Sequence, residues 1–305
     1  MTTSTTTPTV AHTRAELAAA RSALPSQDVG VVMTMGALHE GHARLIDVAR
    51  ARHDVGVVTI FLTPLQFGPK EDLSRYPRTF DDDMRICTES GVDLVFAPSP
   101  DVVYPDGDPG VRVSAGRMGA VLEGAARPGH FDGVLTVVAK LFHLTGASSA
   151  YFGQKDAQQL LLIRRMVRDL DVPVEVVPVP TVREADGLAL SSRNTYLTES
   201  DREVALCLSR ALQAGAEAAT LGPSAVRRAA RGVLVAEPLA LVDYLVLVHP
   251  ETLEDVPEWY RGEALLAVAA RVGTTRLIDN TPLVLGPEGG RLDVFSEDTD
   301  PQESA

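Results

Sequence analysis

The chain has 305 residues, of which 45% are hydrophobic and 23% are charged, with a formal net charge of -13. These proportions are typical of a soluble globular protein with one large or two ordinary domains. The acidic excess argues against binding to nucleic acid or to anionic membranes, because both partners require clustered Lys and Arg. An anion site would therefore have to be built locally, from a few basic side chains and backbone N–H groups.

Neither the first residues nor the cysteines indicate secretion. The opening M-T-T-S-T-T-T-P-T-V lacks the basic and apolar regions of a signal peptide, and no apolar run is long enough to span a membrane. Two cysteines, Cys87 and Cys207, do not make a disulfide framework, so we expect two reduced, partly buried thiols. We accordingly expect a cytoplasmic protein, with residues 1–12 disordered and residues 296–305 forming a solvated acidic tail.

Between residues 13 and 181, short apolar runs alternate with segments of helical periodicity. The first helix should begin at the capping-box sequence T-R-A-E, which starts at Thr13. Further helices are expected at 39–52, 81–89, 134–144 and 156–170, and strands at 28–35, 55–61, 92–98, 149–153 and 174–179. Solid apolar strands that alternate with helices predict a doubly wound α/β domain with a parallel sheet, in which ligands bind beyond the carboxyl ends of the strands.

The pattern changes after residue 181. A loop-like stretch, R-E-A-D-G-L-A-L-S-S-R-N, is followed by two Ala-rich helices, expected at 199–220 and 224–237. Runs at 242–248 and 265–272 then have the character of antiparallel strands. We therefore expect a second, smaller α+β domain over residues 182–295.

Two histidines, His39 and His42, flank Gly41 where the first buried strand gives way to a helix. Their spacing places both on one helix face, so a metal site is conceivable, but no third ligand lies nearby. A structural role is also conceivable for either histidine alone. A phosphate site fits the pair better, because a strand, a Gly turn and a helix N-terminus direct free N–H groups at an anion, and imidazoles donate as well.

Six motifs occur in an order that resembles the pantothenate synthetase (pantoate–β-alanine ligase) family of the nucleotidyltransferase superfamily. They are T-M-G-A-L-H-E-G-H, P-L-Q-F-G, R-Y-P-R-T, A-R-P-G-H-F-D-G-V, F-G-Q-K-D-A-Q-Q and E-A-D-G-L-A-L-S-S-R-N. The resemblance runs from Val31 to Leu197 and continues more weakly beyond. It implies a Rossmann-like first domain and a second domain that closes over ATP.

The resemblance also implies the reaction. In this family the carboxylate of (R)-pantoate attacks the α-phosphorus of ATP, giving pantoyl adenylate and pyrophosphate, and the amine of β-alanine then displaces AMP to give pantothenate. The implied enzyme is a homodimer that uses Mg²⁺ with ATP and no organic cofactor. It has small-molecule partners (ATP, pantoate and β-alanine) and binds neither nucleic acid nor membrane.

The roles of site residues follow from the same resemblance, which makes His42 the general acid. The implied ATP-binding residues are Met35, Gly36, Ala37, Leu38, His39, Glu40, Gly41, His42, Gly153, Gln154, Lys155, Asp156, Val182, Leu190, Ser191, Ser192 and Arg193. Those expected to act in catalysis are His39, His42, Lys155, Ser191, Ser192 and Arg193. Without the family pattern, Lys155 and Asp156 would be an ordinary pair at a helix start, and Ser191 and Ser192 part of a plain turn.

Three further groups complete the implied site. Gln66, Gln159 and Thr63 would bind pantoate or β-alanine, and Tyr76, Glu123, Arg127 and His130 would close the pocket. Asp82 and Asp83 would lie near the Mg²⁺ of Mg-ATP. All three acids of the run 81–83 also suit a helix start, where the helix dipole favours negative charge.

Two positions depart from the family pattern. Thr63 stands where the family has Asn, and Leu190 where it has Met. Leu for Met conserves volume, whereas Thr offers one short hydroxyl in place of an amide. Thr63 therefore leaves open a related ligase that adenylates a different hydroxy acid. A non-catalytic nucleotide-binding paralogue is the third hypothesis, and a tRNA synthetase is disfavoured because the chain is short and acidic.

Overall fold

The computed structural model describes residues 7–68, 73 and 76–291. Its described residues form two compact units. Unit 1 comprises the residues up to Val182 together with Leu190–Ser192, and unit 2 comprises Arg183–Ala189 and the residues from Arg193 onward. The chain therefore passes from one unit to the other three times, at 182/183, 189/190 and 192/193.

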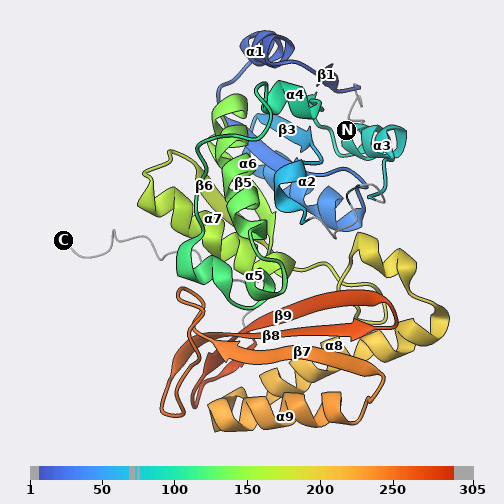
Figure 1. The fold of residues 1–305 in the computed structure, drawn as a ribbon, viewed down its shortest axis with the longest axis vertical. Helices are drawn as coiled ribbons and strands as arrows, with labels where there is room; N and C mark the ends of the chain where they lie inside the picture. Colours follow the sequence, from blue (N-terminus) through green and yellow to red (C-terminus); the bar gives the residue numbers. More distant parts are fainter. Residues whose placement is uncertain (1–6, 69–72, 74–75, 292–305) are drawn as a thin grey trace. The chain divides into compact units, whose positions relative to one another are not determined.

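Unit 1 is built on a six-stranded parallel sheet with the strand order β1-β4-β3-β2-β5-β6 (Figure 1). The strands are β1 (Thr9–Ala11), β2 (Val29–Thr34), β3 (Val55–Ile60), β4 (Leu94–Phe96), β5 (Ser149–Gly153) and β6 (Glu175–Val179). The helices are α1 (Arg14–Ala23), α2 (Glu40–Arg52), α3 (Phe80–Glu89), α4 (Pro100–Val103), α5 (Glu123–Ala126), α6 (His130–Thr145) and α7 (Ala157–Asp169). Short 3-10 turns lie at η1 (Pro64–Gln66), η2 (Gly116–Ala120) and η3 (Gln154–Asp156). The strand order reverses between β2 and β5, and a doubly wound sheet binds its ligand at such a switch point.

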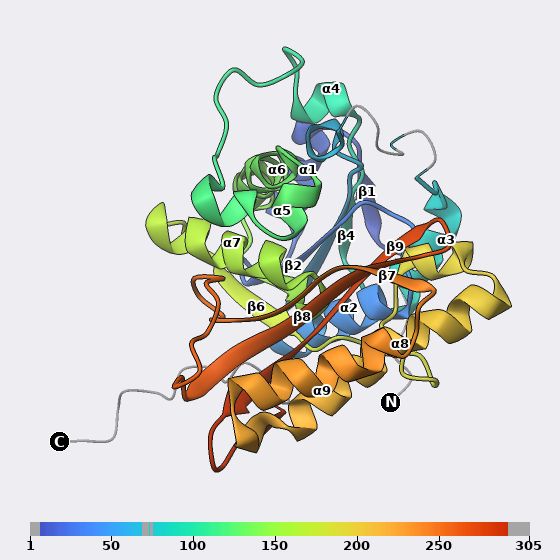
Figure 2. The ribbon, with the colours of Figure 1, turned by 60° about the horizontal axis from the view of Figure 1, so that its bottom comes forward.

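Alternate strand residues supply two hydrophobic cores, one on each face of this sheet. Val31, Val57 and Phe96 belong to the core that α1, α6 and α7 cover. Val32, Val58 and Val95 belong to the core that α2 and α3 cover. Figure 2 shows the two helical layers on opposite sides of the strands. The predicted doubly wound α/β fold is therefore confirmed.

The amino-terminal residues correct one expectation. Disorder was predicted as far as residue 12, but Thr9–Ala11 forms β1 and pairs in parallel with β4. A three-residue edge strand is too short to produce a pattern that a sequence would reveal. The capping box at Thr13 is present, with the hydroxyl of Thr13 accepting from the N–H of Glu16 and the carboxylate of Glu16 accepting in return. Residues 1–6 and the predicted tail at 296–305 lie outside the described residues.

Unit 2 contains an antiparallel sheet in the order β10-β9-β8-β7, with α8 and α9 packed side by side against it (Figure 2). Its elements are η4 (Ser192–Tyr196), which starts at the unit boundary, α8 (Glu199–Glu217), η5 (Ala219–Leu221), α9 (Pro223–Val235), β7 (Ala240–Val248), β8 (Gly262–Val272), β9 (Thr275–Leu285) and β10 (Gly290–Arg291). No sequence pattern indicated β9, because polar residues and Pro282 interrupt its apolar run. Buried Asp279 in this strand accepts two hydrogen bonds from the Arg183 guanidinium, at 2.7 and 3.0 Å.

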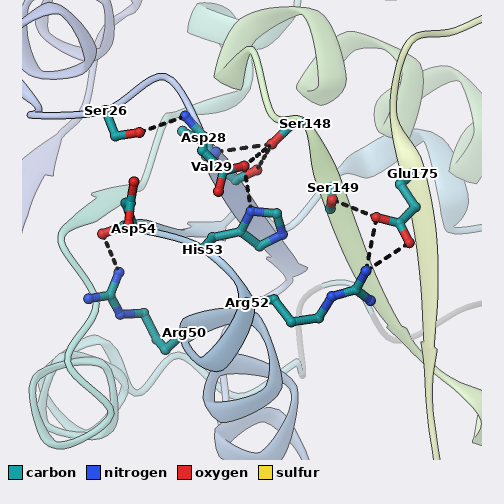
Figure 3. Close-up of polar contacts among 10 residues, drawn as sticks. All are labelled: Ser26, Asp28, Val29, Arg50, Arg52, His53, Asp54, Ser148, Ser149 and Glu175. Carbon is teal, nitrogen blue, oxygen red and sulfur yellow. Dashed lines mark hydrogen bonds and ion pairs between the residues drawn. The ribbon is translucent and has the colours of Figure 1, made fainter.

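The last turn of α2 contacts the amino ends of three strands in unit 1, and Figure 3 shows two of these contacts, those of His53 with Asp28 and of Arg52 with Glu175. The ring of His53, which caps α2, lies 2.7 Å from the carboxylate of Asp28, just before β2. The guanidinium of Arg52 contacts the carboxylate of Glu175 in β6 at 3.1 Å. Arg50 contacts Asp93, just before β4, at 2.7 Å. These contacts fix the direction of α2, whose first turn lies at the opposite, carboxyl edge of the sheet.

Both cysteines are free and buried, as expected. Burial raises the pKa of Cys87 to about 12 and that of Cys207 to about 11. Both thiols therefore stay protonated and unreactive near neutral pH. Within the described ranges, no helix combines the length and the apolar character needed to cross a membrane.

Candidate active site

The loop from β2 to α2 makes a sharp turn at two consecutive residues with positive φ. Gly36 has a φ of +85° and Ala37 a φ of +52°. A local hydrogen bond stabilises the turn, because the N–H of Gly36 donates to the hydroxyl of Thr34 at 3.2 Å. The next two amides, of Ala37 and Leu38, donate to the carboxylate of Asp83 at 3.2 and 2.8 Å. The chain therefore enters α2 from a loop whose amides are already engaged.

The hydrogen bonds of His39 and His42 fix the tautomer of each imidazole. The Nδ1 of His39, the N-cap of α2, accepts from the N–H of Gly41 at 3.1 Å. The Nδ1 of His42 accepts from the N–H of His39 at 3.3 Å. A neutral imidazole whose Nδ1 accepts carries its proton on Nε2. The two rings, with centroids 4.1 Å apart, therefore offer a pair of Nε2–H donors beside a helix N-terminus.

The surroundings keep both imidazoles neutral. Burial, the neighbouring His39 and Lys155 together lower the pKa of His42 to about 3, with burial as the largest cause and Asp156 acting in the opposite direction. Burial also lowers the pKa of His39, with Lys155 acting in the same direction and Asp156 against it. Near neutral pH both rings therefore donate hydrogen bonds without carrying charge. A general-acid role for His42 would require the negative charge of a bound ligand to raise this pKa.

The low pKa of His42 predicts a measurable effect on stability. Above pH 6.5 the ring is neutral in both the folded and the unfolded chain, so it contributes no pH dependence. Between pH 6.5 and about 3 the unfolded chain binds a proton that the folded chain does not, so stability falls with falling pH by about 1.4 kcal/mol per unit. We expect His42→Gln to lack this component, so the unfolding free energy of the wild type should fall relative to the variant between about pH 6.5 and about pH 4.5. Urea unfolding across this range measures the difference, and parallel curves would contradict the expectation.

Lys155 and Asp156 lie in η3, directly after β5, the strand beside β2. Neighbouring parallel strands end at the same edge of the sheet, which places Lys155 close enough to act on both imidazoles. Leu190 lies close to the same residues. A Cβ added at Gly41 would lie 3.4 Å from the Cδ2 of Leu190 and 2.9 Å from the Cε1 of His39. The N–H of Leu190 donates to the carbonyl of Val182 at 2.9 Å. The structure thus brings together, at the switch point, residues from distant parts of the sequence.

Gln66 sits at the end of η1, in a turn supported from α6. Its side-chain amide donates to the Sδ of Met35 at 2.8 Å. Its backbone carbonyl accepts from the Nδ1 of buried His130 at 2.8 Å, and the Nε2 of His130 lies 2.9 Å from the guanidinium of Arg127. Gly133 in α6 permits the close approach of this helix to η1, because a Cβ at Gly133 would lie 2.1 Å from the carbonyl oxygen of Leu65. Arg127 and His130, expected to close the pocket, thus contact the turn that carries Gln66.

Thr63 is buried, with 1% of its surface exposed, and its hydroxyl lies 2.9 Å from the hydroxyl of Tyr104. Sequence reasoning missed Tyr104, which is 41 positions away and belongs to none of the motifs. It also missed Gln158, whose buried amide accepts from the N–H of Glu123 and donates to the carbonyls of Met118 and Val121. Burial distinguishes Gln158 from the half-exposed Gln159 beside it, and a single sequence does not carry that distinction.

The structure also places Tyr76, Asp82 and the segment 191–193. Tyr76 packs edge-on against Phe67, with ring centroids 6.3 Å apart, and Asp82 is exposed in the first turn of α3. Ser191 and Ser192 belong to unit 1 with Leu190, whereas Arg193 belongs to unit 2. The roles assigned to all the expected site residues, Glu40, Gly153, Gln154 and Gln159 among them, stay predictions. Over the described parts of the chain, no three His, Cys, Asp or Glu side chains are grouped as metal ligands.

A doubly wound sheet with paired imidazole donors, a helix N-terminus and a lysine at its switch point defines an α/β enzyme of the nucleotide-binding class. The family model described as pantoate-beta-alanine ligase matches residues 5–282. The chain belongs to this family, whose members are ligases that form an amide bond.

Similar proteins cover nearly the whole chain. The pantothenate synthetase of Thermobifida fusca is 57% identical over 288 residues, which span 92% of this chain and 97% of the relative. The crystal structure of pantothenate synthetase from Thermus thermophilus is 51% identical, with a TM-score of 0.83, and the match covers 89% of this chain and 98% of that one. The pantoate-beta-alanine ligase of Francisella tularensis, crystallised with beta-gamma ATP and beta-alanine, is 33% identical with a TM-score of 0.73, and covers 90% and 97%.

Proposed function

We propose that this chain condenses (R)-pantoate with β-alanine through a pantoyl-adenylate intermediate, giving pantothenate, AMP and pyrophosphate. The observation that carries the proposal is the meeting of His39, His42 and Lys155 at the β2–β5 switch point, in a chain of the pantoate-beta-alanine ligase family. Both steps need positioning and charge stabilisation but no covalent protein nucleophile. The two unreactive thiols are compatible with such chemistry.

The first step forms a bond between a pantoate carboxylate oxygen and the α-phosphorus of ATP, while the bond to pyrophosphate breaks. Negative charge grows on the oxygen that leaves. The Nε2–H groups of His39 and His42 and the ammonium of Lys155 stabilise it, since donors fixed before reaction act most strongly in the transition state. Gln66 and Gln159 would orient pantoate, because an amide can donate to a carboxylate and accept from a hydroxyl.

In the second step the neutral amine of β-alanine attacks the acyl carbon of the adenylate. The acyl–phosphate bond breaks, AMP leaves, and the amine gives up a proton. Ser191, Ser192 and Arg193 would bind the β- and γ-phosphates of ATP during the first step. Tyr76 and Glu123 would help to exclude water in both steps, in keeping with their positions in the family motifs. Water exclusion matters here because hydrolysis of the adenylate would waste the intermediate.

Mg²⁺ would be held mainly by the phosphates of ATP, where it supplies charge neutralisation. Mg²⁺ usually keeps several waters and uses one or two carboxylates. Asp82 suits this role, because its carboxylate is exposed in the first turn of α3.

We also propose a cytoplasmic homodimer. Light scattering coupled to size-exclusion chromatography would test the dimer, and a monomer across micromolar concentrations would rule it out.

The proposed reaction predicts exchange of labelled pyrophosphate into ATP that depends on pantoate and Mg²⁺, with β-alanine absent. Reversal of the adenylate step is the only source of such exchange. Omission of pantoate is the control, and a panel of other short hydroxy acids tests substrate identity. Stronger exchange with another acid would favour the related ligase, whereas ATP binding without exchange would favour the non-catalytic paralogue.

A further inference from the structure

The side chain of Asp83 is the most deeply buried carboxylate near the proposed site. It lies in the first turn of α3 with 1% of its surface exposed. One oxygen, Oδ1, accepts from the N–H of Leu38 at 2.8 Å and from the hydroxyl of Thr79 at 3.1 Å. The other, Oδ2, accepts from the N–H of Ala37 at 3.2 Å. Both oxygens are thus used to hold protein groups, and two of the three donors belong to the β2–α2 loop.

The loop needs an acceptor at this point. Ala37 has a φ of +52°, a strained conformation for an L-residue that persists only when its surroundings hold it in place. The side chain of Leu38 is also buried, so its N–H would otherwise lack a partner in a place that water does not reach. A carboxylate answers both requirements, because it accepts from two successive amides and so holds the strained turn.

Gly36 allows the carboxylate to come this close. A Cβ added at Gly36 would lie 3.0 Å from the Oδ2 of Asp83, and its φ of +85° suits glycine. The turn leads directly into His39, whose backbone N–H sets the tautomer of His42. Asp83 thus influences the pair of imidazole donors through Leu38, which it binds, and His39, which follows Leu38 in the chain.

We propose that Asp83 is a positioning residue that holds the β2–α2 loop in its phosphate-binding shape, and that it is not a ligand of Mg²⁺. A buried carboxylate whose two oxygens both accept protein hydrogen bonds does not suit an ion that keeps several of its waters. The inference rests on the proposed function only in treating this loop as an ATP site. Its primary test needs no turnover.

The test compares Asp83→Asn with the wild type by amide hydrogen exchange, followed by NMR or mass spectrometry over residues 36–39. An Asn amide keeps one acceptor oxygen and turns an NH₂ group toward backbone donors. We expect exchange at Ala37 and Leu38 to accelerate by about 10- to 100-fold, the range for losing hydrogen bonds to a charged acceptor. Unchanged protection of these two amides would overturn the inference, whatever the variant does to activity.

A second measurement separates positioning from metal binding. ATP affinity is titrated with EDTA and at graded Mg²⁺ concentrations. If Asp83 positions the loop, Asp83→Asn should weaken ATP binding by a similar factor, about tenfold, at every Mg²⁺ concentration, and the Mg²⁺ concentration for half-maximal binding should stay the same. A Mg²⁺ ligand would instead show a raised half-maximal Mg²⁺ concentration, and that result would refute the proposal.

Variants nearby provide controls. Asp81→Asn removes an exposed carboxylate from the same helical turn and should leave both measurements within about twofold of the wild type. Thr79→Val removes one donor to Asp83 and should speed exchange at Leu38 by about 2- to 10-fold, the range for one neutral hydrogen bond, whereas Thr79→Ser should restore protection. If Asp83→Asn fails to fold, the Thr79 pair still decides, because equal exchange in both variants would contradict the inference.

Discussion

Replacement of Lys155 by methionine is expected to slow pantoate-dependent ATP–pyrophosphate exchange by about 100- to 1000-fold, the usual effect of removing one preorganised group that stabilises transition-state charge. Methionine conserves most of the side-chain volume while removing the ammonium. Because Lys155 is only half-buried, the unfolding free energy should change little. Arg168→Met, at an exposed position of α7, is the matched control and should keep wild-type exchange.

A second readout tests whether Lys155 acts where the geometry places it. The ammonium lowers the pKa of His39 and of His42, so its removal should raise both pKa values. NMR titration of the ring protons in the ligand-free protein measures this without turnover. A loss of exchange below about fivefold, or unmoved histidine pKa values, would contradict the role assigned to Lys155.

Gly133→Ala is expected to destabilise unit 1 by about 2–3 kcal/mol, as an overpacked buried position does, and to raise the KM for pantoate. The added Cβ would lie 2.1 Å from the carbonyl oxygen of Leu65 and 2.8 Å from the backbone nitrogen of Gln66. Backbone atoms cannot rotate away, so either α6 or the Gln66 turn must shift. Urea unfolding and initial-rate kinetics measure the two effects.

Gly232→Ala is the matched control, because Gly232 also lies within a helix, α9, but a Cβ there meets nothing within 4 Å. Alanine at an exposed helical position should stabilise by up to about 1 kcal/mol. The two substitutions should thus have opposite signs. Stability of Gly133→Ala equal to the wild type would show that the close approach of α6 to η1 is not rigid.

The fold of unit 1 could be predicted well from the sequence, because buried parallel strands leave solid apolar runs that need no knowledge of their partners. The pairing of His39 with His42 was also predictable, since strand, glycine and helix start are local in the sequence. By contrast, β9 was missed because Asp279 is buried in it by a partner nearly a hundred positions away, Arg183. Such a pair makes a core strand look like a polar loop.

The same limit explains the missed partners in the site. The sequence placed Asp83 near the Mg²⁺ of Mg-ATP or as an ordinary acid at a helix start, because nothing local shows that the amides of Ala37 and Leu38 reach it. The available signal was that Asp83 precedes Cys87 by four residues, a spacing that places both on the same, buried face of α3. Thr63 suggested an altered substrate contact, whereas the structure pairs its hydroxyl with Tyr104. Motif comparison therefore does not reveal contacts that are made at long range in the sequence.

The contacts of Arg50, Arg52 and His53 have a consequence for the opposite edge of the sheet. α2 has 13 residues and is about 20 Å long, so a small rotation about these contacts displaces its far end considerably. A tilt of about 5° about these contacts would displace the first turn of α2 by about 2 Å. A misplacement of about 1 Å at a reacting centre can cost about 100-fold in rate. Surface ion pairs that contribute little to stability can therefore set the alignment of groups a helix-length away.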